Sequence, residues 1–241
     1  MKHGLIFDLD GTLVDSLQGI AASLNHALAL SGLPVHAHEA VRGFIGNGVK
    51  ILIRRASPAA ADEALLDAIE WEFKAHYDLN WQTGTIIYPG ITDLLESLQS
   101  RGHPLAVLSN KPHPFTVAMV SRLFPSVRFA VVLGQRPGIP HKPDPAGALE
   151  ISAALGLSPA ECSVIGDSTM DIETARNAGM RAVAVTWGFH DRERLLAAGA
   201  VQLADEPEEL LDLNLDPAET AGTHLGKSKR AVELAADPED A

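Results

Sequence analysis

The sequence has a single cysteine and no cluster of basic residues. Because Cys162 has no second cysteine to pair with, an intrachain disulfide is excluded, which favours a reducing, cytoplasmic location. Cys162 falls in an apolar run, where we expect an inert buried thiol. With 19 basic against 31 acidic side chains, the formal charge is −12, so we expect no nucleic-acid partner.

Long apolar runs are also missing. The first residues, MKHGLIFDLDG, reach an acidic side chain after a short apolar run, so we expect no signal peptide. Elsewhere the apolar stretches fall short of the roughly 20 residues that a membrane-spanning helix needs. Hydrophobic residues still make up 46% of the 241, which is a globular composition. We therefore expect a cytoplasmic protein without a membrane partner, either a monomer or a homodimer.

Short apolar runs, each followed by polar residues or glycine, predict buried strands. These runs lie at residues 5–7, 105–108, 130–133, 163–165 and 182–185. Helical patterns alternate with them, as at residues 91–99, where Gly102 is expected to stop the helix. Strands that alternate with helices predict an α/β fold, a doubly wound parallel sheet with helices on both faces.

Residues 16–85 interrupt this alternation. Their apolar residues recur at helical spacing, and we find no convincing strand among them. We therefore predict a helical cap at residues 16–85, inserted into an α/β core of residues 1–15 and 86–213. The aromatic residues of the cap are expected to pack inside it, namely Trp71, Phe73, Tyr77 and Trp81. Residues 214–241 contain few large apolar side chains and are expected to form a loosely ordered tail.

Asp8 and Asp10 follow the first predicted strand. Residues two apart at an extended strand end point the same way, so both carboxylates can face one site. In an open α/β sheet, such sites form at the carboxyl ends of strands. The alternative is a plain strand-ending turn, because Asp-Gly is common in turns, and Thr12 could hold that turn with its hydroxyl.

Asp167 and Asp171 follow a later strand in the sequence GDSTMD. Asp, Ser and Thr all cap helices, so one interpretation is a helix N-cap. A carboxylate that caps a helix can also coordinate a cation, and the two interpretations are compatible. Together with the first pair, these acids provide oxygen ligands only, which suits Mg²⁺.

Two further pieces carry groups that bind phosphate. Ser109 and Asn110 follow the strand at 105–108, where a hydroxyl and backbone amides at a strand-to-helix turn can form an anion-binding nest. Lys142 lies in the sequence HKPDP and can supply a point charge for phosphate oxygens. Taken alone, Lys142 would be read as a surface loop residue.

In this order, the four motifs resemble the signature of the haloacid dehalogenase-like hydrolases, namely DxDGT, a strand-ending Ser or Thr, a later Lys and GDxxxD. The resemblance covers roughly residues 4–211. Several passages are similar to the phosphoglycolate phosphatase branch of that family, namely FDLDGTLVDS, RGFIGNGVKIL, YPGITDLLESLQSRGHPLAVLSNKP, KPDPAGALE and VIGDSTMDIETARNAGM. That branch carries a helical cap just after its first motif, which matches residues 16–85.

The resemblance implies a Mg²⁺-dependent phosphomonoester hydrolase. Asp8 would attack phosphorus and form an aspartyl-phosphate, while Asp10 would act as the general acid and base. Ser109, the backbone amide of Asn110 and Lys142 would bind the transferring phosphoryl oxygens. The expected substrate is phosphoglycolate or a similar small phosphorylated metabolite.

The resemblance also implies a ligand set for Mg²⁺. The Asp8 carboxylate, the Asp10 backbone carbonyl and Asp167 would bind the cation, and Asp171 would hold its coordination shell directly or through water. The cation would offset the repulsion between the anionic nucleophile and the phosphate.

The sequence Gly46-Asn47-Gly48 lies within the predicted cap. One interpretation is a flexible turn that leads into a helix at residues 49–56. The other is a cap loop whose amides and Asn47 contact the non-phosphate end of the substrate, which the family resemblance favours. Arg42 is a weaker candidate for binding a substrate carboxylate, and could equally be a surface charge.

Two other functions remain as alternatives. A phosphomutase acting on a sugar phosphate would keep the same core and change what the cap admits. A two-component receiver also uses strand-end acids and an aspartyl-phosphate, but it lacks a helical insertion after its first strand. Asp10 also argues against a receiver, because a second acid placed for hydrolysis would shorten the life of the phosphorylated state.

Overall fold

A computed structural model describes residues 2–213, so the predicted tail at 214–241 lies outside the described residues. Its central feature is a six-stranded sheet in the order β5-β4-β1-β6-β7-β8, with every neighbouring pair parallel. The strands are β1 (Gly4–Phe7), β4 (Leu105–Pro112), β5 (Phe129–Gln135), β6 (Cys162–Gly166), β7 (Arg181–Val185) and β8 (Leu203–Ala204). From β1 the chain builds the sheet first in one direction and then in the other, so the doubly wound α/β prediction is confirmed.

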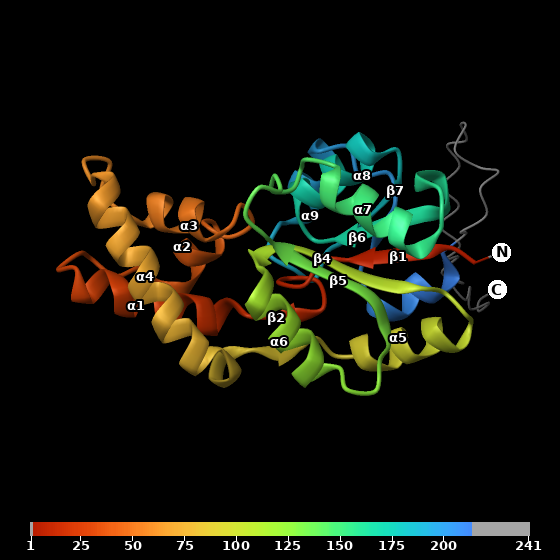
Figure 1. Cartoon of the computed structure of the whole chain (residues 1–241), viewed down its shortest axis with the longest axis horizontal. Coiled ribbons are helices and arrows are strands. Elements are labelled where there is room, and N and C mark those ends of the chain that lie inside the picture. The colour runs from red at the N-terminus through yellow and green to blue at the C-terminus, as the bar shows by residue number, and fades with distance from the viewer. Residues whose placement is uncertain (1, 214–241) are drawn as a thin grey trace, which may run out of the picture.

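Two layers of helices cover the sheet (Figure 1). Helices α5 (Ile91–Ser100) and α6 (His113–Leu123) pack on one face, and α7 (Ala146–Leu155) and α8 (Thr169–Ala178) pack on the other. Alternation along β1 divides the core, because Leu5 and Phe7 join one hydrophobic cluster and Ile6 joins a second. A shorter helix, α9 (Arg192–Ala197), follows β7. The sheet is therefore buried on both faces, as the continuous apolar runs in its strands predict.

Residues 17–84 form helices joined by loops and contain no strand. They comprise α1 (Leu17–Leu30), α2 (His38–Arg42), α3 (Val49–Ala56), α4 (Glu63–Asn80) and the short 3₁₀ helix η1 (Trp81–Gly84). We call residues 16–85 the helical insert. Figure 1 shows it as a separate group of helices beyond the carboxyl end of β1. At its two ends, β2 (Val14–Asp15) and β3 (Ile86–Ile87) pair with each other in antiparallel fashion.

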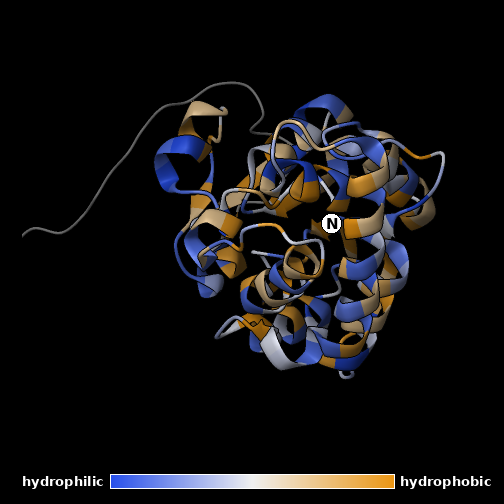
Figure 2. Ribbon diagram, turned by 90° about the vertical axis from the view of Figure 1, so that its left-hand side faces the viewer, coloured by the Kyte–Doolittle hydropathy of each residue, from blue (hydrophilic) through white to orange (hydrophobic). Residues whose placement is uncertain are grey.

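Helix α4 forms one wall of the helical insert. The Asp62 side chain caps it by accepting a hydrogen bond from the Leu65 amide at 2.9 Å. Phe73 and Tyr77 lie on its buried face, one turn apart. Figure 2 shows hydrophobic and hydrophilic residues alternating along the helices of this end of the molecule, as expected for helices with one buried face.

One packing prediction is wrong. Trp71 is 67% exposed, because α4 turns it away from the face that packs on α1. Phe73, Tyr77 and Trp81 are buried as expected, and α3 covers the predicted residues 49–56. Within residues 2–213, the structure contains no helix with the length and apolar character needed to cross a membrane.

Candidate active site

The carboxyl ends of the central strands carry the predicted polar residues. Asp8 follows β1, Ser109 lies near the end of β4 and Asp167 follows β6. Because these strands are parallel neighbours, their ends meet at one edge of the sheet. Asp8, Asp10, Ser109 and Asn110 line one cavity at this edge, and the helical insert forms its other side.

Asp8 is nearly inaccessible to solvent, at 8% exposed. Its Oδ1 accepts a hydrogen bond from the Leu9 amide at 2.7 Å and lies 3.0 Å from Lys142 Nζ. Burial raises the pKa of Asp8 to about 7, against the opposing effect of Lys142, and the nearby Asp171 raises it further. The surroundings of Asp8 therefore disfavour its charged form, and Lys142 offsets part of this effect.

Asp8, Asp167 and Asp171 form a buried acidic cluster, with one oxygen of each within 4.8 Å of the others. Asp167 accepts hydrogen bonds from Thr12 Oγ1 at 2.9 Å and from the Phe189 amide at 2.7 Å. Burial, followed by repulsion from Asp8 and Asp171, raises the pKa of Asp167 to about 8. Thr12 thus holds Asp167 across the sheet edge, a contact that its expected role in the turn did not include.

The acidic cluster fits a hard divalent cation. Its ligands are oxygens, they are buried close together, and their repulsion is relieved when a positive ion binds between them. Asp10 lies outside this carboxylate cluster, so any part it takes in binding a cation falls to its backbone carbonyl.

Asp171 combines the two predicted roles at the start of α8. Its Oδ2 accepts hydrogen bonds from the Ser168 amide at 3.1 Å and from Ser168 Oγ at 2.6 Å, which completes a capping box. Its Oδ1 lies 2.6 Å from Lys142 Nζ. The helix cap therefore orients a carboxylate toward the acidic cluster.

Lys142 is 5% exposed, so the interpretation as a surface loop residue is wrong. Its ammonium bridges Asp8 and Asp171 and donates to the Leu108 carbonyl at 3.1 Å. Burial lowers the pKa of Lys142, but the two carboxylates outweigh burial, and the net shift is upward. Lys142 is therefore a fixed positive charge within the acidic cluster.

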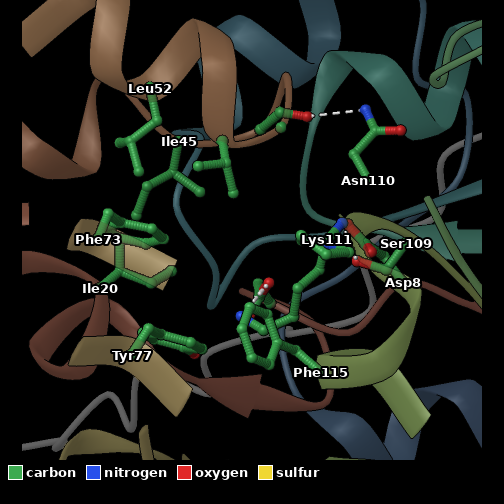
Figure 3. A pocket seen from close by; sticks show the side chains of 15 residues that line it. Asp8, Ile20, Ile45, Leu52, Phe73, Tyr77, Ser109, Asn110, Lys111 and Phe115 are labelled. Carbon is green, nitrogen blue, oxygen red and sulfur yellow. Dashed lines mark hydrogen bonds and ion pairs between the residues drawn. The ribbon is translucent and has the colours of Figure 1, made fainter. Parts of the chain in front are cut away.

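The Asn110 side chain, in β4, bonds to two other segments. Its Oδ1 accepts from the Lys142 amide at 2.8 Å, and its Nδ2 donates to the Lys142 carbonyl at 3.1 Å. The same Nδ2 donates to the carbonyl of Gly46 in the helical insert at 3.0 Å, the dashed line in Figure 3. Beyond the predicted role of its backbone amide, Asn110 thus connects the core to the insert.

Lys111 is a site residue that the sequence motifs did not identify. Its Nζ lies 3.0 Å from each carboxylate oxygen of Asp10, and it sits 4.5 Å from the centre of the Tyr77 ring. Ser16 Oγ also donates to Asp10 at 2.5 Å. Burial lowers the pKa of Lys111, but Asp10 and Tyr77 raise it by more. The one signal in the sequence was its position, because Lys111 directly follows Ser109 and Asn110, which were predicted to bind phosphate.

The four predicted residues of the insert separate into two pairs. Gly46 and Gly48 line the cavity, and Gly48 has a φ of 82° with His141 close beside it. Arg42 instead donates to the carbonyls of two core residues, at 2.5 Å to Gly188 and 3.0 Å to Phe189. Arg42 thus contacts the core in this structure, and its contact with a substrate stays a prediction.

Asn47 is also turned away from the cavity. Its Nδ2 contacts the sulfur of Met170 at 3.2 Å, and its Oδ1 accepts from Arg55 at 2.9 Å. Asn47, like Arg42, therefore contacts the core, although it was expected to meet the substrate.

The fold and the site together define a class of protein. It is an α/β enzyme with acidic groups at the carboxyl edge of a parallel sheet. The sequence profile of the haloacid dehalogenase-like hydrolases matches residues 5–185, and the chain belongs to this family. The resemblance drawn from the motifs is thereby confirmed.

Individual relatives narrow the assignment. The chain is 34% identical over 213 residues to a phosphoglycolate phosphatase of Pectobacterium atrosepticum, covering 87% of this chain and 88% of that one. It is 32% identical over 219 residues to a phosphoglycolate phosphatase of Pseudomonas putida, covering 89% and 80%. The crystal structure of a predicted phosphoglycolate phosphatase from Haemophilus somnus is similar with a TM-score of 0.82 at 30% identity, covering 88% and 97%. The chain is therefore a phosphatase of this branch of the family.

Proposed function

We propose that the chain hydrolyses phosphate monoesters with the help of Mg²⁺, through an aspartyl-phosphate formed on Asp8. One observation carries this proposal: Asp8 faces the cavity while it is paired with Lys142 and belongs to the acidic cluster. A buried carboxylate with a fixed cation and a cation site beside it is suited to attack an anionic phosphate.

In the first step, an oxygen of Asp8 forms a bond to phosphorus as the ester P–O bond breaks. Asp10 starts this step protonated, gives its proton to the leaving oxygen as the alcohol departs, and becomes a carboxylate. Asp10 lines the same cavity as Asp8, and Ser16 and Lys111 hold its carboxylate in place.

In the second step, a water molecule gives a proton to Asp10 and attacks phosphorus. The bond between Asp8 and phosphorus breaks, inorganic phosphate leaves, and Asp8 is again a carboxylate. Ser109, the Asn110 amide and Lys142 are the proposed partners of the phosphoryl oxygens in both steps. Ser109 and Asn110 line the cavity, and Lys142 contacts Asp8 directly.

Asp8, Asp167 and Asp171 are the proposed carboxylate ligands of Mg²⁺, with the Asp10 carbonyl as a further ligand. When bound, the cation supplies positive charge that offsets the repulsion between Asp8 and the phosphate. Burial and the neighbouring carboxylates raise the pKa of both Asp8 and Asp167, so a bound cation would stabilise their charged forms.

The proposed substrate is a small phosphorylated metabolite, and the names of the relatives make phosphoglycolate the reference compound. We propose that the helical insert acts as the cap, because it closes one side of the cavity and bonds to the core through Gly46 and Arg42. A cytoplasmic monomer or homodimer completes the proposal.

Asp8→Asn tests the mechanism, because it keeps the side-chain shape and removes the attacking charge. Hydrolysis of phosphoglycolate and of 4-nitrophenyl phosphate should fall by at least about 10³-fold, while the circular dichroism spectrum is unchanged. Mass spectrometry of acid-quenched wild type should find a phosphoryl group on Asp8. Near-normal turnover by Asp8→Asn would show that the covalent mechanism is wrong.

A further inference from the structure

The half of the cavity formed by the helical insert is apolar. Figure 3 shows Ile20, Ile45, Leu52 and Phe73 grouped on one side, with Asp8 and Ser109 on the other. Val49 lies in the same lining, at the start of α3. A substrate phosphate at Asp8 therefore places the organic group of the ester against hydrocarbon side chains.

Aromatic rings continue this apolar wall toward the catalytic residues. Tyr77 stacks on Phe73 with ring centres 5.6 Å apart, and Phe115 meets Tyr77 edge-on at 5.4 Å. The cavity measures about 520 Å³, counted together with its opening to solvent.

The positive charges at the cavity already have partners. Among the described residues that line it, Lys111 is the only lysine or arginine, and Asp10 neutralises it with both oxygens at 3.0 Å. Lys142 is likewise paired with Asp8 and Asp171. Among the described lysines and arginines that line the cavity, a second anionic group on a substrate would find none without a carboxylate partner.

The three arginines of the insert do not alter this charge balance, and Arg54 pairs with Glu63 at 2.6 Å. Arg42 donates to core carbonyls, and Arg55 donates to the Phe44 carbonyl at 3.0 Å and to Asn47 at 2.9 Å. Neither side chain lines the cavity. A carboxylate placed among Ile45, Leu52 and Phe73 would lose its hydration without gaining a cation, which is strongly unfavourable.

We infer that the preferred substrate is a phosphate monoester whose organic group is uncharged and apolar, an alkyl or aryl group. This inference rests on the proposed phosphatase function and specifies its substrate class. Each methylene group that leaves water for the apolar wall favours binding. Phosphoglycolate, the reference compound of the relatives, should therefore be a poor substrate for this chain.

The first test compares ethyl, butyl and hexyl phosphate with phosphoglycolate in the presence of Mg²⁺. The alkyl alcohols are similarly weak acids, so differences within that series report contacts with the organic group. We expect kcat/KM to rise about two- to fourfold per methylene until the cavity is filled. Butyl phosphate should exceed phosphoglycolate by at least about tenfold, a ratio that corresponds to about 1.4 kcal/mol.

The second test places a cation in the apolar wall. Val49→Lys should change the ratio of kcat/KM for phosphoglycolate to that for butyl phosphate by at least about tenfold in favour of phosphoglycolate. Ile51→Lys is the matched control, because Ile51 lies on the same helix, is exposed and is absent from the cavity lining. It should leave the ratio unchanged.

The outcomes separate the two proposals. Hydrolysis with a preference for phosphoglycolate in wild type would overturn the substrate class and leave the phosphatase standing. Failure of wild type to hydrolyse any of the four esters would overturn the proposed function, and the substrate class with it. The wild-type series decides the substrate class even if Val49→Lys does not fold.

Discussion

The two sides of the cavity are built on opposite physical principles. On the core side, each charged group is held by another one, as Lys142 is held by Asp8 and Asp171. On the insert side, the lining consists of hydrocarbon side chains, glycine and the ring of Tyr77, with Leu52 and Phe73 contributing packing surface. Charge fixed by the sheet suits a reaction at phosphorus, whereas an apolar wall on helices suits discrimination between organic groups. Under the proposals above, chemistry and selectivity are carried by different segments of the chain.

The metal requirement should belong to the core side alone, and this prediction has the largest expected effect. Asp167→Ala removes one carboxylate of the acidic cluster and should raise the Mg²⁺ concentration for half-maximal activity by at least about tenfold. Asp205→Ala is the control, because Asp205 is an exposed acid of the core that pairs with Arg192. Titration of activity with Mg²⁺ distinguishes the two, and full activity in excess EDTA would contradict the assignment of the metal.

Arg42 lies where the two sides meet, so its substitution tests their separation. Arg42→Met removes two hydrogen bonds from the insert to the Gly188 and Phe189 carbonyls. We expect KM to rise about tenfold, as for the loss of one charged hydrogen bond of about 1.5 kcal/mol. Arg54→Met, which removes an exposed pair with Glu63, should leave KM unchanged.

The Mg²⁺ requirement of Arg42→Met is the sharper measurement. It should equal that of wild type if the insert influences only substrate binding. Phe189, however, also donates its amide to Asp167. A shift in the Mg²⁺ titration would therefore show that closure of the insert and the metal site are coupled. The proposed separation of chemistry in the core from selectivity in the insert would then be wrong.

The opposite edge of the sheet should affect stability and leave catalysis unchanged. His3 lies there, with its Nε2 2.9 Å from Ser163 Oγ, and burial lowers its pKa to about 4, helped by Arg181 and His103. Because the folded pKa lies below the usual 6.5, protonation favours the unfolded chain. Stability from neutral His3 is complete above pH 6.5 and declines as the pH falls toward 4.

Urea denaturation at pH 7 and pH 5 measures this effect. Between these values, wild type should lose about 2 kcal/mol more unfolding free energy than His3→Asn, which cannot take up the proton. The kcat of the variant at pH 7 should equal that of wild type. An equal loss of stability in both proteins would show that His3 is not held neutral by the fold.

The sheet could be predicted closely because its signals are local. Each apolar run became a strand, since the central strands are buried on both faces and the edge strand β5 is partly buried. Gly102 follows α5 with a φ of 85° as a helix stop requires. Asp8, Asp167 and Asp171 could be placed together for the same reason, because the ends of parallel strands share one edge.

The contacts between core and insert could not be predicted. They join residues far apart in the sequence, such as Arg42 and Gly188, and no periodicity records such a pairing. Lys111 was missed because its partners, Asp10 and Tyr77, come from two other segments. Trp71 differs from Phe73 only in its position around α4, and small errors in helix phase decide which side is buried.

The short pairing of β2 with β3 has an evolutionary consequence. Val14 lies opposite Ile87 and Asp15 opposite Ile86, so the chain leaves the core and returns to it at adjacent points. A segment attached in this way can be lengthened, shortened or replaced by recombination without moving Asp8 or the strands beside it. Exchange of residues 16–85 could therefore change which phosphate esters an enzyme accepts, while the residues that act on phosphorus stay the same.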